Sequence, residues 1–99
     1  MARFDVYANP DGLGYLLDIQ AGFLSHLTTR VVVPLLPLEH APMPAKGLNP
    51  RFRIGDEEVL MATQFMAAVP NSTIKNPVAT LNHRHHEIVD AIDLLMQGF

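Results

Sequence analysis

The sequence predicts a mostly β fold of the α+β class, in which antiparallel strands are followed by one C-terminal α-helix. Two observations lead to this prediction. Short runs rich in β-branched and aromatic residues alternate with turn signals through the first two thirds of the chain. From Asn82 onward, the apolar residues recur instead at helical spacing. The 99 residues suit one domain, which we expect to span 1–99.

The N-terminal part of the chain is expected to form a hairpin. In "RFDVYA", Phe4 and Val6 alternate with Asp5 and Tyr7, which is typical of a strand with one buried face. "YLLDIQ" (15–20) predicts a second strand. The turn signal "NPDG" separates the two runs, so we expect a hairpin whose loop is longer than two residues.

The next apolar run, "RVVVPLLPL" (30–38), is β-branched and then rich in leucine. Pro34 and Pro37 have no amide hydrogen to donate, so they argue against a fully paired central strand and favour a bulge or a sheet edge. Three of the eight prolines follow within 39–50, together with a glycine and an asparagine. We therefore expect 39–50 to be a loop.

The middle of the chain predicts a second hairpin. "RFRI" (51–54), "GDE" (55–57) and "EVLMATQF" (58–65) are expected to form a strand, a turn and a strand. This run should end at "AAVP" (67–70), and "STIK" (72–75) is expected to form one more short strand.

The C-terminal segment predicts an amphipathic helix. Asn82 is a good N-cap residue, and Gly98 is a natural helix terminator. The apolar residues at helical spacing between them are Ile88, Val89, Ala91, Ile92, Leu95 and Met96.

The composition restricts the classes of function. Hydrophobic residues make up 48% of the chain and charged residues 17%, which is apolar for a small domain and indicates a surface that faces a partner, most simply a second copy. The net charge of −3 and the scattered basic residues give no strong electrostatic footprint for nucleic acid. The chain has no cysteine, no visible signal peptide and no run long enough to span a membrane, so we expect a cytoplasmic protein.

The most conspicuous polar group is "HRHH" (83–86). On a helix, His83 lies one turn before Glu87 and His86 one turn before Asp90, and both spacings suit metal ligands. The order His-Glu-x-x-His of the zinc proteases is absent. We favour a solvated first helical turn over a metal site, and expect neither metal nor cofactor.

No other motif indicates an enzyme active site. The chain has no Gly-x-Ser-x-Gly sequence, no glycine-rich phosphate loop and no cysteine nucleophile. The acidic residues Asp56, Glu57 and Glu58 fall in a predicted turn, where charge is normal.

Several large apolar residues lie at positions where the sequence predicts no core for them to pack into. "FL" (23–24) falls between two predicted strands, and Met96 and Phe99 lie at the end of the helix. Asp93 lies in the last helical turn, where the helix dipole disfavours a negative charge by roughly 0.3–1 kcal/mol. Both a role within the monomer and contact with a partner stay open for these residues.

Together these motifs resemble the CcdB family, the toxins of plasmid-addiction toxin–antitoxin pairs. "LLDIQAGFL" (16–24) is similar to that family's second strand and following loop, and "RVVVPL" (30–35) to its central strand, including the proline. "IGDE" (54–57) matches its turn. "MAAVP" (66–70) and the segment 81–99 match its C-terminal part, so the resemblance covers essentially the whole chain.

The resemblance implies an SH3-like barrel with a C-terminal helix, assembled as a homodimer. It implies action by binding rather than by catalysis: such a toxin binds the A subunit of DNA gyrase and traps the complex of gyrase with cleaved DNA. A CcdA-like antitoxin would neutralise the toxin, and operator DNA would be bound only together with that antitoxin. No membrane partner is implied.

The resemblance also implies a gyrase-binding site. Its expected residues are Phe23, Leu24, Asp93, Met96, Gln97, Gly98 and Phe99. Gly98 matches the family's ending, whereas Gln97 stands where a Trp of the best-known member stacks on a gyrase cation. Loss of this cation–π contact, worth roughly 0.5–2 kcal/mol, would lower the affinity roughly 2- to 30-fold. Asp93 stands at an Asn position and could offset part of this loss by pairing with an arginine.

Two other hypotheses stay open. Toxins of the same barrel architecture cut RNA, and Arg30, Arg51 and Arg53 are the candidates for contacting phosphate, although the chain is acidic and has no evident basic groove. Gln97 indicates instead a degenerate homologue that binds antitoxin but poisons gyrase poorly. For the dimer, we expect "VVVPLLP" (31–37) and the final helix to lie near the interface.

Overall fold

Short strands and 3-10 turns alternate along the chain until one α-helix closes it, in the computed structural model of residues 2–98. The strands are β1 (Asp5–Ala8), β2 (Tyr15–Asp18), β3 (Thr29–Pro37), β4 (Arg51–Ile54), β5 (Glu57–Met61), β6 (Ala67–Pro70) and β7 (Ala79–Thr80). The 3-10 helices are η1 (Gly22–Leu24), η2 (Leu38–His40), η3 (Thr63–Phe65), η4 (Asn71–Thr73) and η5 (Asn82–Arg84). They are followed by the helix α1 (His85–Gln97).

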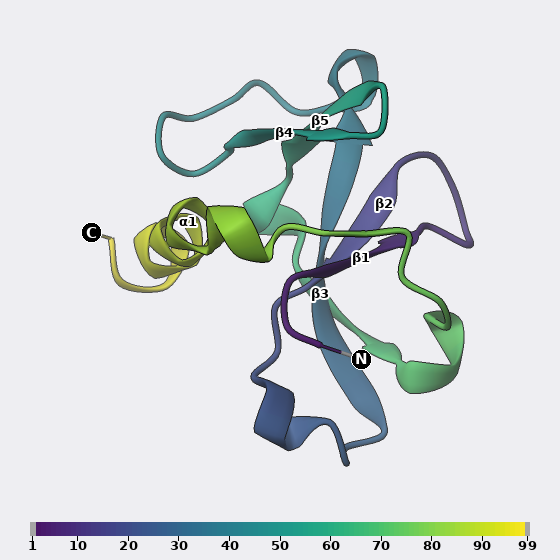
Figure 1. Ribbon diagram of the computed structural model, residues 1–99. Coiled ribbons are helices and arrows are strands. Elements are labelled where there is room, and N and C mark those ends of the chain that lie inside the picture. Colours follow the sequence, from purple (N-terminus) through teal and green to yellow (C-terminus); the bar gives the residue numbers. More distant parts are fainter. Residues whose placement is uncertain (1, 99) are drawn as a thin grey trace.

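The strands form one antiparallel sheet that curls into a nearly closed barrel. Its order is β4-β5-β3-β2-β1-β7, and β6 also pairs with β3. Figure 1 shows β3 running through the length of the molecule, with the β4–β5 hairpin across its upper part and α1 to one side. The predicted class, antiparallel strands in an SH3-like barrel with a C-terminal helix, is confirmed.

The two prolines do not place β3 at a sheet edge, which was one of the two expected possibilities; β3 is central, but its pairing on one side is interrupted at Pro34. On one side, β3 pairs with β2 over residues 32–35, and on the other it pairs first with β6 and then with β5. Pro34 falls between the stretch paired with β6 and the stretch paired with β5, where no ladder donor is needed. Its carbonyl still accepts a hydrogen bond from the amide of Ala62 at 2.9 Å.

Strand β1 begins later than predicted and is covered on both faces. Phe4 has a φ of 73°, which is not extended, so the strand begins at Asp5. Val6 enters the main core, while Tyr7, expected on an exposed face, is buried in a second cluster on the other face. The alternation of Phe4 and Val6 with polar neighbours therefore identified a strand but not its environment.

The region after β5 differs most from the prediction. The expected strand over 58–65 ends at Met61 and continues as the 3-10 helix η3. The segment 67–70 forms a strand of its own, β6, rather than the end of the preceding run. The expected strand at 72–75 does not form: its first half belongs to η4, and its second half lies outside any strand.

Two clusters of buried side chains hold the barrel together. The main core lies between the sheet and α1; it comprises Phe4, Val6, Leu17, Ile19, Val33, Leu35, Phe52, Ile54, Val59, Met61, Leu81, Ile88 and Ala91. The smaller cluster, of Tyr7, Leu16, Val32 and Ile74, covers the opposite face of the central strands. The middle of β3 is thus buried on both faces.

The helix α1 starts at His85, and the position before it is two residues later than the predicted N-cap, Asn82. Asn82 belongs to η5, and its side chain makes no cap hydrogen bond to this helix; the position before the helix is Arg84. The guanidinium of Arg84 lies 4.8 Å from the centre of the Phe52 ring and forms an ion pair with Glu87. Arg84 therefore fastens the start of α1 to β4 in place of a polar cap.

A buried ion pair lies on the side of the smaller cluster. Asp18 on β2 and Arg30 on β3 both have 0% exposed side chains, and Arg30 Nη2 lies 2.7 Å from Asp18 Oδ2. Arg30 Nε also donates to Asp18 Oδ2 at 3.0 Å. Burial raises the pKa of Asp18 above its usual value, although the hydrogen bonds from Arg30 and from the Gln20 amide act in the opposite direction.

We expect Arg30→Met to lower the free energy of unfolding by about 3–5 kcal/mol, because it leaves the Asp18 carboxyl buried without its partner. The double variant Asp18→Asn/Arg30→Met removes both charges and keeps an acceptor for the Gln20 amide, so it should be more stable than Arg30→Met alone. Urea unfolding of Arg30→Met, Asp18→Asn and the double variant measures these values. A double variant as unstable as the sum of its single variants would contradict the coupling.

Candidate interaction site

The loop between β2 and β3 exposes a large aromatic side chain. Phe23, in η1, is 81% exposed, and Leu24 beside it is half-buried. No residue of η1 is buried. The expected apolar pair at 23–24 is therefore present on the surface, but Phe23 contributes most of it.

The other expected contacts lie at the end of α1. Met96 is 63% exposed, Gln97 is exposed and Asp93 is half-buried. Gly98 ends the helix with a φ of 82°, and its amide donates to the carbonyl of Leu94 at 2.9 Å, which confirms the predicted termination. Phe99 lies outside the residues that the structure describes.

The structure brings these residues together only in part. Met96, Gln97 and Gly98 adjoin one another at the last turn of α1, whereas Phe23 lies in η1. Figure 1 shows η1 at the lower end of the view and the end of α1 at its left edge, as two separate parts of one monomer. A partner that contacts both parts has to span the surface between them.

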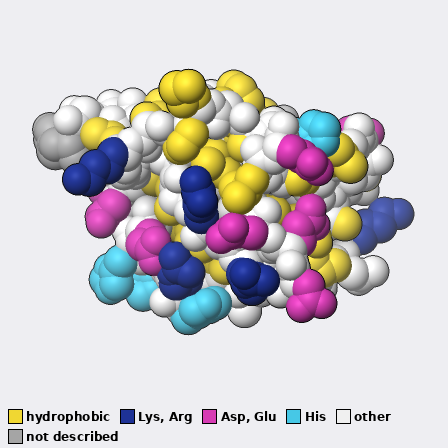
Figure 2. Space-filling model, turned by 90° about the horizontal axis from the view of Figure 1, so that it is seen from above, with side chains coloured by type: hydrophobic (Ala, Val, Ile, Leu, Met, Phe, Trp, Pro, Cys, Tyr) yellow, Lys and Arg dark blue, Asp and Glu magenta, His cyan; other side chains and the backbone are white. Residues whose placement is uncertain are grey.

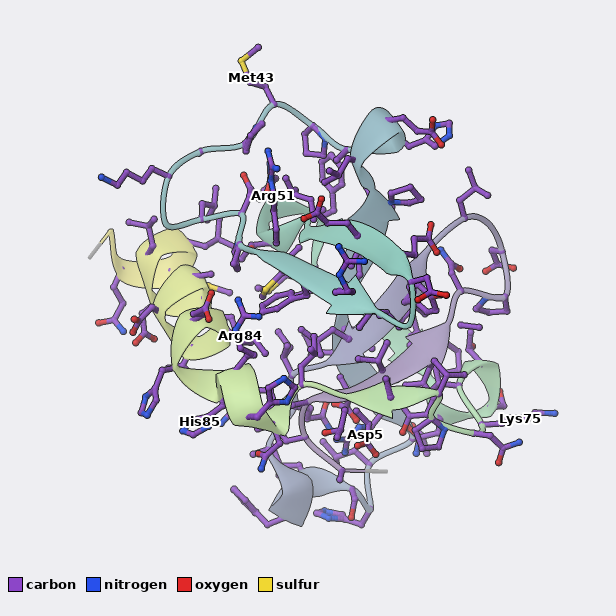
Figure 3. All side chains as sticks on the ribbon, turned by 45° about the horizontal axis from the view of Figure 1, so that its top comes forward. Asp5, Met43, Arg51, Lys75, Arg84 and His85 are labelled. Atoms are coloured by element: carbon purple, nitrogen blue, oxygen red, sulfur yellow. The ribbon has the colours of Figure 1, made fainter. Side chains whose placement is uncertain are left out.

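Some exposed apolar residues were not singled out by the sequence. Met43 is 91% exposed between two prolines of the loop after η2, and Phe65 in η3 is 51% exposed. Figure 3 shows Met43 projecting away from the rest of the molecule. The flanking Pro42 and Pro44 were the only available signal, since they exclude this methionine from regular secondary structure.

Hydrophobic side chains gather in the upper middle of the face seen in Figure 2, while basic, acidic and histidine side chains are intermixed across its centre and lower part and along both sides. The intermixing leaves no extended basic patch on this face. Such a surface is better suited to a protein partner than to a nucleic acid backbone.

An open cleft of about 310 Å³ lies between the loop before β4 and α1. Its lining includes Gly47, Pro50, Glu87 and Asp90. The hydrogen bonds from Arg84 lower the pKa of Glu87, so this carboxylate is already neutralised by its neighbour. The cleft therefore lies along the line where this loop meets the helix, and Glu87 in its lining is already paired.

The histidines at the start of α1 face one another and the backbone. The His85 and His86 rings lie 4.1 Å apart, and His85 Nδ1 lies 2.8 Å from the carbonyl oxygen of Asn82. Within residues 2–98, no three His, Cys, Asp or Glu side chains converge as metal ligands would.

In the same part of the chain, no helix has the length and apolarity needed to cross a bilayer.

Comparison with solved structures identifies the class of fold. A structure described as an endoribonuclease in complex with its cognate antitoxin, from a mycobacterial species, matches with a TM-score of 0.74. The match covers 97% of this chain and 94% of the other, at 13% sequence identity. At that identity, the similarity defines the architecture alone: a small antiparallel barrel closed by a C-terminal helix.

The family follows from the sequence comparison. The model of the family described as CcdB protein matches residues 3–98, nearly the whole chain. The chain belongs to the CcdB family, and it is thus a toxin of the toxin–antitoxin kind. The resemblance noted from short motifs is confirmed over the full barrel and helix.

We expect Phe23→Ala to change the free energy of unfolding by less than about 0.5 kcal/mol, because an exposed side chain makes few packing contacts. The matched variant Phe52→Ala removes a ring that is 2% exposed in the main core, and should cost about 3–5 kcal/mol. Urea unfolding of both variants tests the contrast. A large loss with Phe23→Ala would mean that the ring serves folding instead of recognition.

Proposed function

We propose that this protein binds the A subunit of DNA gyrase and holds the enzyme on cleaved DNA, so that double-strand breaks persist. Membership of the CcdB family supports this proposal. The observation that carries it is the exposure of Phe23 and Met96 at positions that match the family's gyrase contacts. Neither side chain is needed for the core, so a partner is the simplest reason for two large apolar groups in water.

The proposed contact surface consists of Phe23, Leu24, Asp93, Met96, Gln97, Gly98 and Phe99. Gly98 is suited to this role because its left-handed conformation turns the chain out of the helix. Met96 is unbranched and flexible, and can adapt to an irregular apolar pocket. Gln97 cannot stack on a cation as an aromatic side chain does, so we expect a weaker poison than a member with Trp at this position.

We propose a CcdA-like antitoxin as the natural partner that removes the toxin from gyrase, with operator DNA bound only by the complex. The solved structure of similar fold is itself described as a complex with its cognate antitoxin. The exposed Met43 and Phe65 add apolar surface beyond the proposed gyrase contacts, and a segment that wraps the barrel would cover such surface.

A ribonuclease is the second candidate, because the solved structure of similar fold is described as an endoribonuclease. Of the three arginines suggested for phosphate contact, Arg30 has no exposed surface and is engaged by Asp18. Arg51 and Arg53 are exposed on β4, but Glu58 lies directly opposite Arg53 on β5. This arrangement favours action by binding over catalysis.

In a supercoiling and cleavage assay with purified gyrase, we expect the intact chain to produce linear DNA and a chain ending at Met96 to produce none. Gln97→Trp should raise potency by roughly 2- to 30-fold if it restores one cation–π contact. The assay measures the toxin concentration that gives half-maximal linear DNA.

Two exposed methionines provide a matched control for this assay. Met96→Ala should weaken poisoning, whereas Met43→Ala should not, because only Met96 belongs to the proposed gyrase contact. Equal cleavage by the intact and shortened chains would refute the role of the last residues. Cleavage of RNA by the purified protein, abolished by Arg51→Ala, would establish the second candidate instead.

We further propose that the protein is a homodimer. The expected interface comprises 31–37 and the final helix. Within 31–37, Val32, Val33 and Leu35 are buried in the monomer, which leaves the half-buried Val31, Pro34 and Leu36 for a partner. On the helix, we propose the exposed Leu95. Sedimentation at micromolar concentration should give about twice the monomer mass of 11.0 kDa, and Leu95→Glu should shift the protein to a monomer. A wild-type monomer at that concentration would contradict the proposal.

A further inference from the structure

One buried amide holds both ends of the loop that carries Phe23. The Gln20 side chain, directly after β2, donates from Nε2 to the carbonyl oxygens of Leu24 and Thr29, each at 3.2 Å. Its Oε1 accepts from the amide of Val31 at 3.0 Å. A single side chain therefore joins η1 to the start of β3, and its donors and its acceptor are all used.

The backbone of Gln20 is itself fixed by the buried ion pair. Its amide donates to Asp18 Oδ1 at 3.0 Å, and its carbonyl accepts from Arg30 Nη2 at 3.2 Å. Since Asp18 and Arg30 have no exposed surface, the base of the loop cannot shift without breaking a buried, charged network. Gln20 therefore connects the loop to the ion pair between β2 and β3.

Apolar packing holds η1 only weakly, because Phe23 is exposed and Leu24 is half-buried. Beyond Gln20, the loop is fastened at its far end, where Asn71 Nδ2 donates to the carbonyl of Leu27 at 2.6 Å and the Asn71 amide to that of Thr28 at 2.9 Å. The half that contains Phe23 depends on Gln20. Without this side chain, the hydrogen bonds left to η1 among residues 2–98 are its own short-range turn bonds.

We propose that Gln20 is a positioning residue for target binding: it holds η1 in the conformation that presents Phe23, and does not contact the target itself. This inference rests on the proposed function, in which Phe23 is a gyrase contact. A loop held in its bound conformation loses less conformational entropy on association, so its restraint appears as affinity.

The test uses Gln20→Glu, which keeps the size of the side chain and the acceptor for Val31 but removes the donor to Leu24 and Thr29. Amide hydrogen exchange reports the loop through Leu24, Ser25 and Leu27, whose amides bond within it. We expect exchange at these three amides to rise roughly 10-fold relative to β3, and affinity for the gyrase A subunit to fall by a similar factor. Gln20→Met, which adds no charge beside Asp18, should give the same pattern if Gln20→Glu does not fold.

Two comparisons separate positioning from general stability. In a Phe23→Ala/Leu24→Ala background, Gln20→Glu should cause no further loss of affinity, because both contact side chains that it positions are gone. Asn49→Asp is the matched control: Asn49 Nδ2 donates to the Met61 carbonyl at 2.9 Å and its Oδ1 accepts from the Ala45 amide, so it fastens a different loop. It should leave exchange at Leu24, Ser25 and Leu27 unchanged.

Exchange that rises equally throughout the barrel, or a loss of affinity that persists in the Phe23→Ala/Leu24→Ala background, would overturn the inference. If the wild-type protein does not bind gyrase, the proposed function fails and Phe23 is no gyrase contact. Hydrogen exchange needs no target, so it decides separately whether Gln20 holds the loop.

Discussion

The buried ion pair of Asp18 and Arg30 is the constraint on which the surface of this toxin depends. It joins β2 to β3 where neither side chain reaches water, and the guanidinium also binds the Gln20 carbonyl. Burial raises the pKa of Asp18, so ionisation of this carboxyl is less favourable in the folded protein than in the unfolded chain. The pair is better explained by the geometry it fixes than by net stability: it determines where the chain leaves β2 and returns as β3.

Strand β3 transmits this constraint to the rest of the barrel. It pairs with β2 on one side and with β6 and β5 on the other, and its middle is covered by a cluster on each face. Pro34 is accepted in so central a strand because it lies between two partner strands, where its missing amide hydrogen breaks no ladder bond. At this interruption, the partner of β3 on that side changes from β6 to β5.

The residues proposed for recognition lie on parts that the barrel holds but does not bury. Phe23 is carried by a polar network, and Met96 by the last turn of a helix anchored through Ile88 and Ala91 in the core. Such a division suits a toxin that acts by binding. A side chain that is buried in the core has no exposed surface left for a partner to cover. The same division explains why Arg30, attractive as a phosphate ligand from sequence, has a structural role: its charge is already used by Asp18.

The sequence by itself determined the antiparallel strands, the 39–50 loop, the C-terminal helix, its termination at Gly98 and the family, because turn chemistry and periodicity are local properties of the chain. Only the tertiary structure decided that β3 is central, that Tyr7 is buried, that 67–70 pairs as a strand and that 72–75 does not. It also decided that Arg30 is inaccessible and that Phe23 and Met96 are exposed on separate elements. These outcomes depend on which distant segments cover a given face. The local sequence around a residue does not determine its neighbours across the sheet.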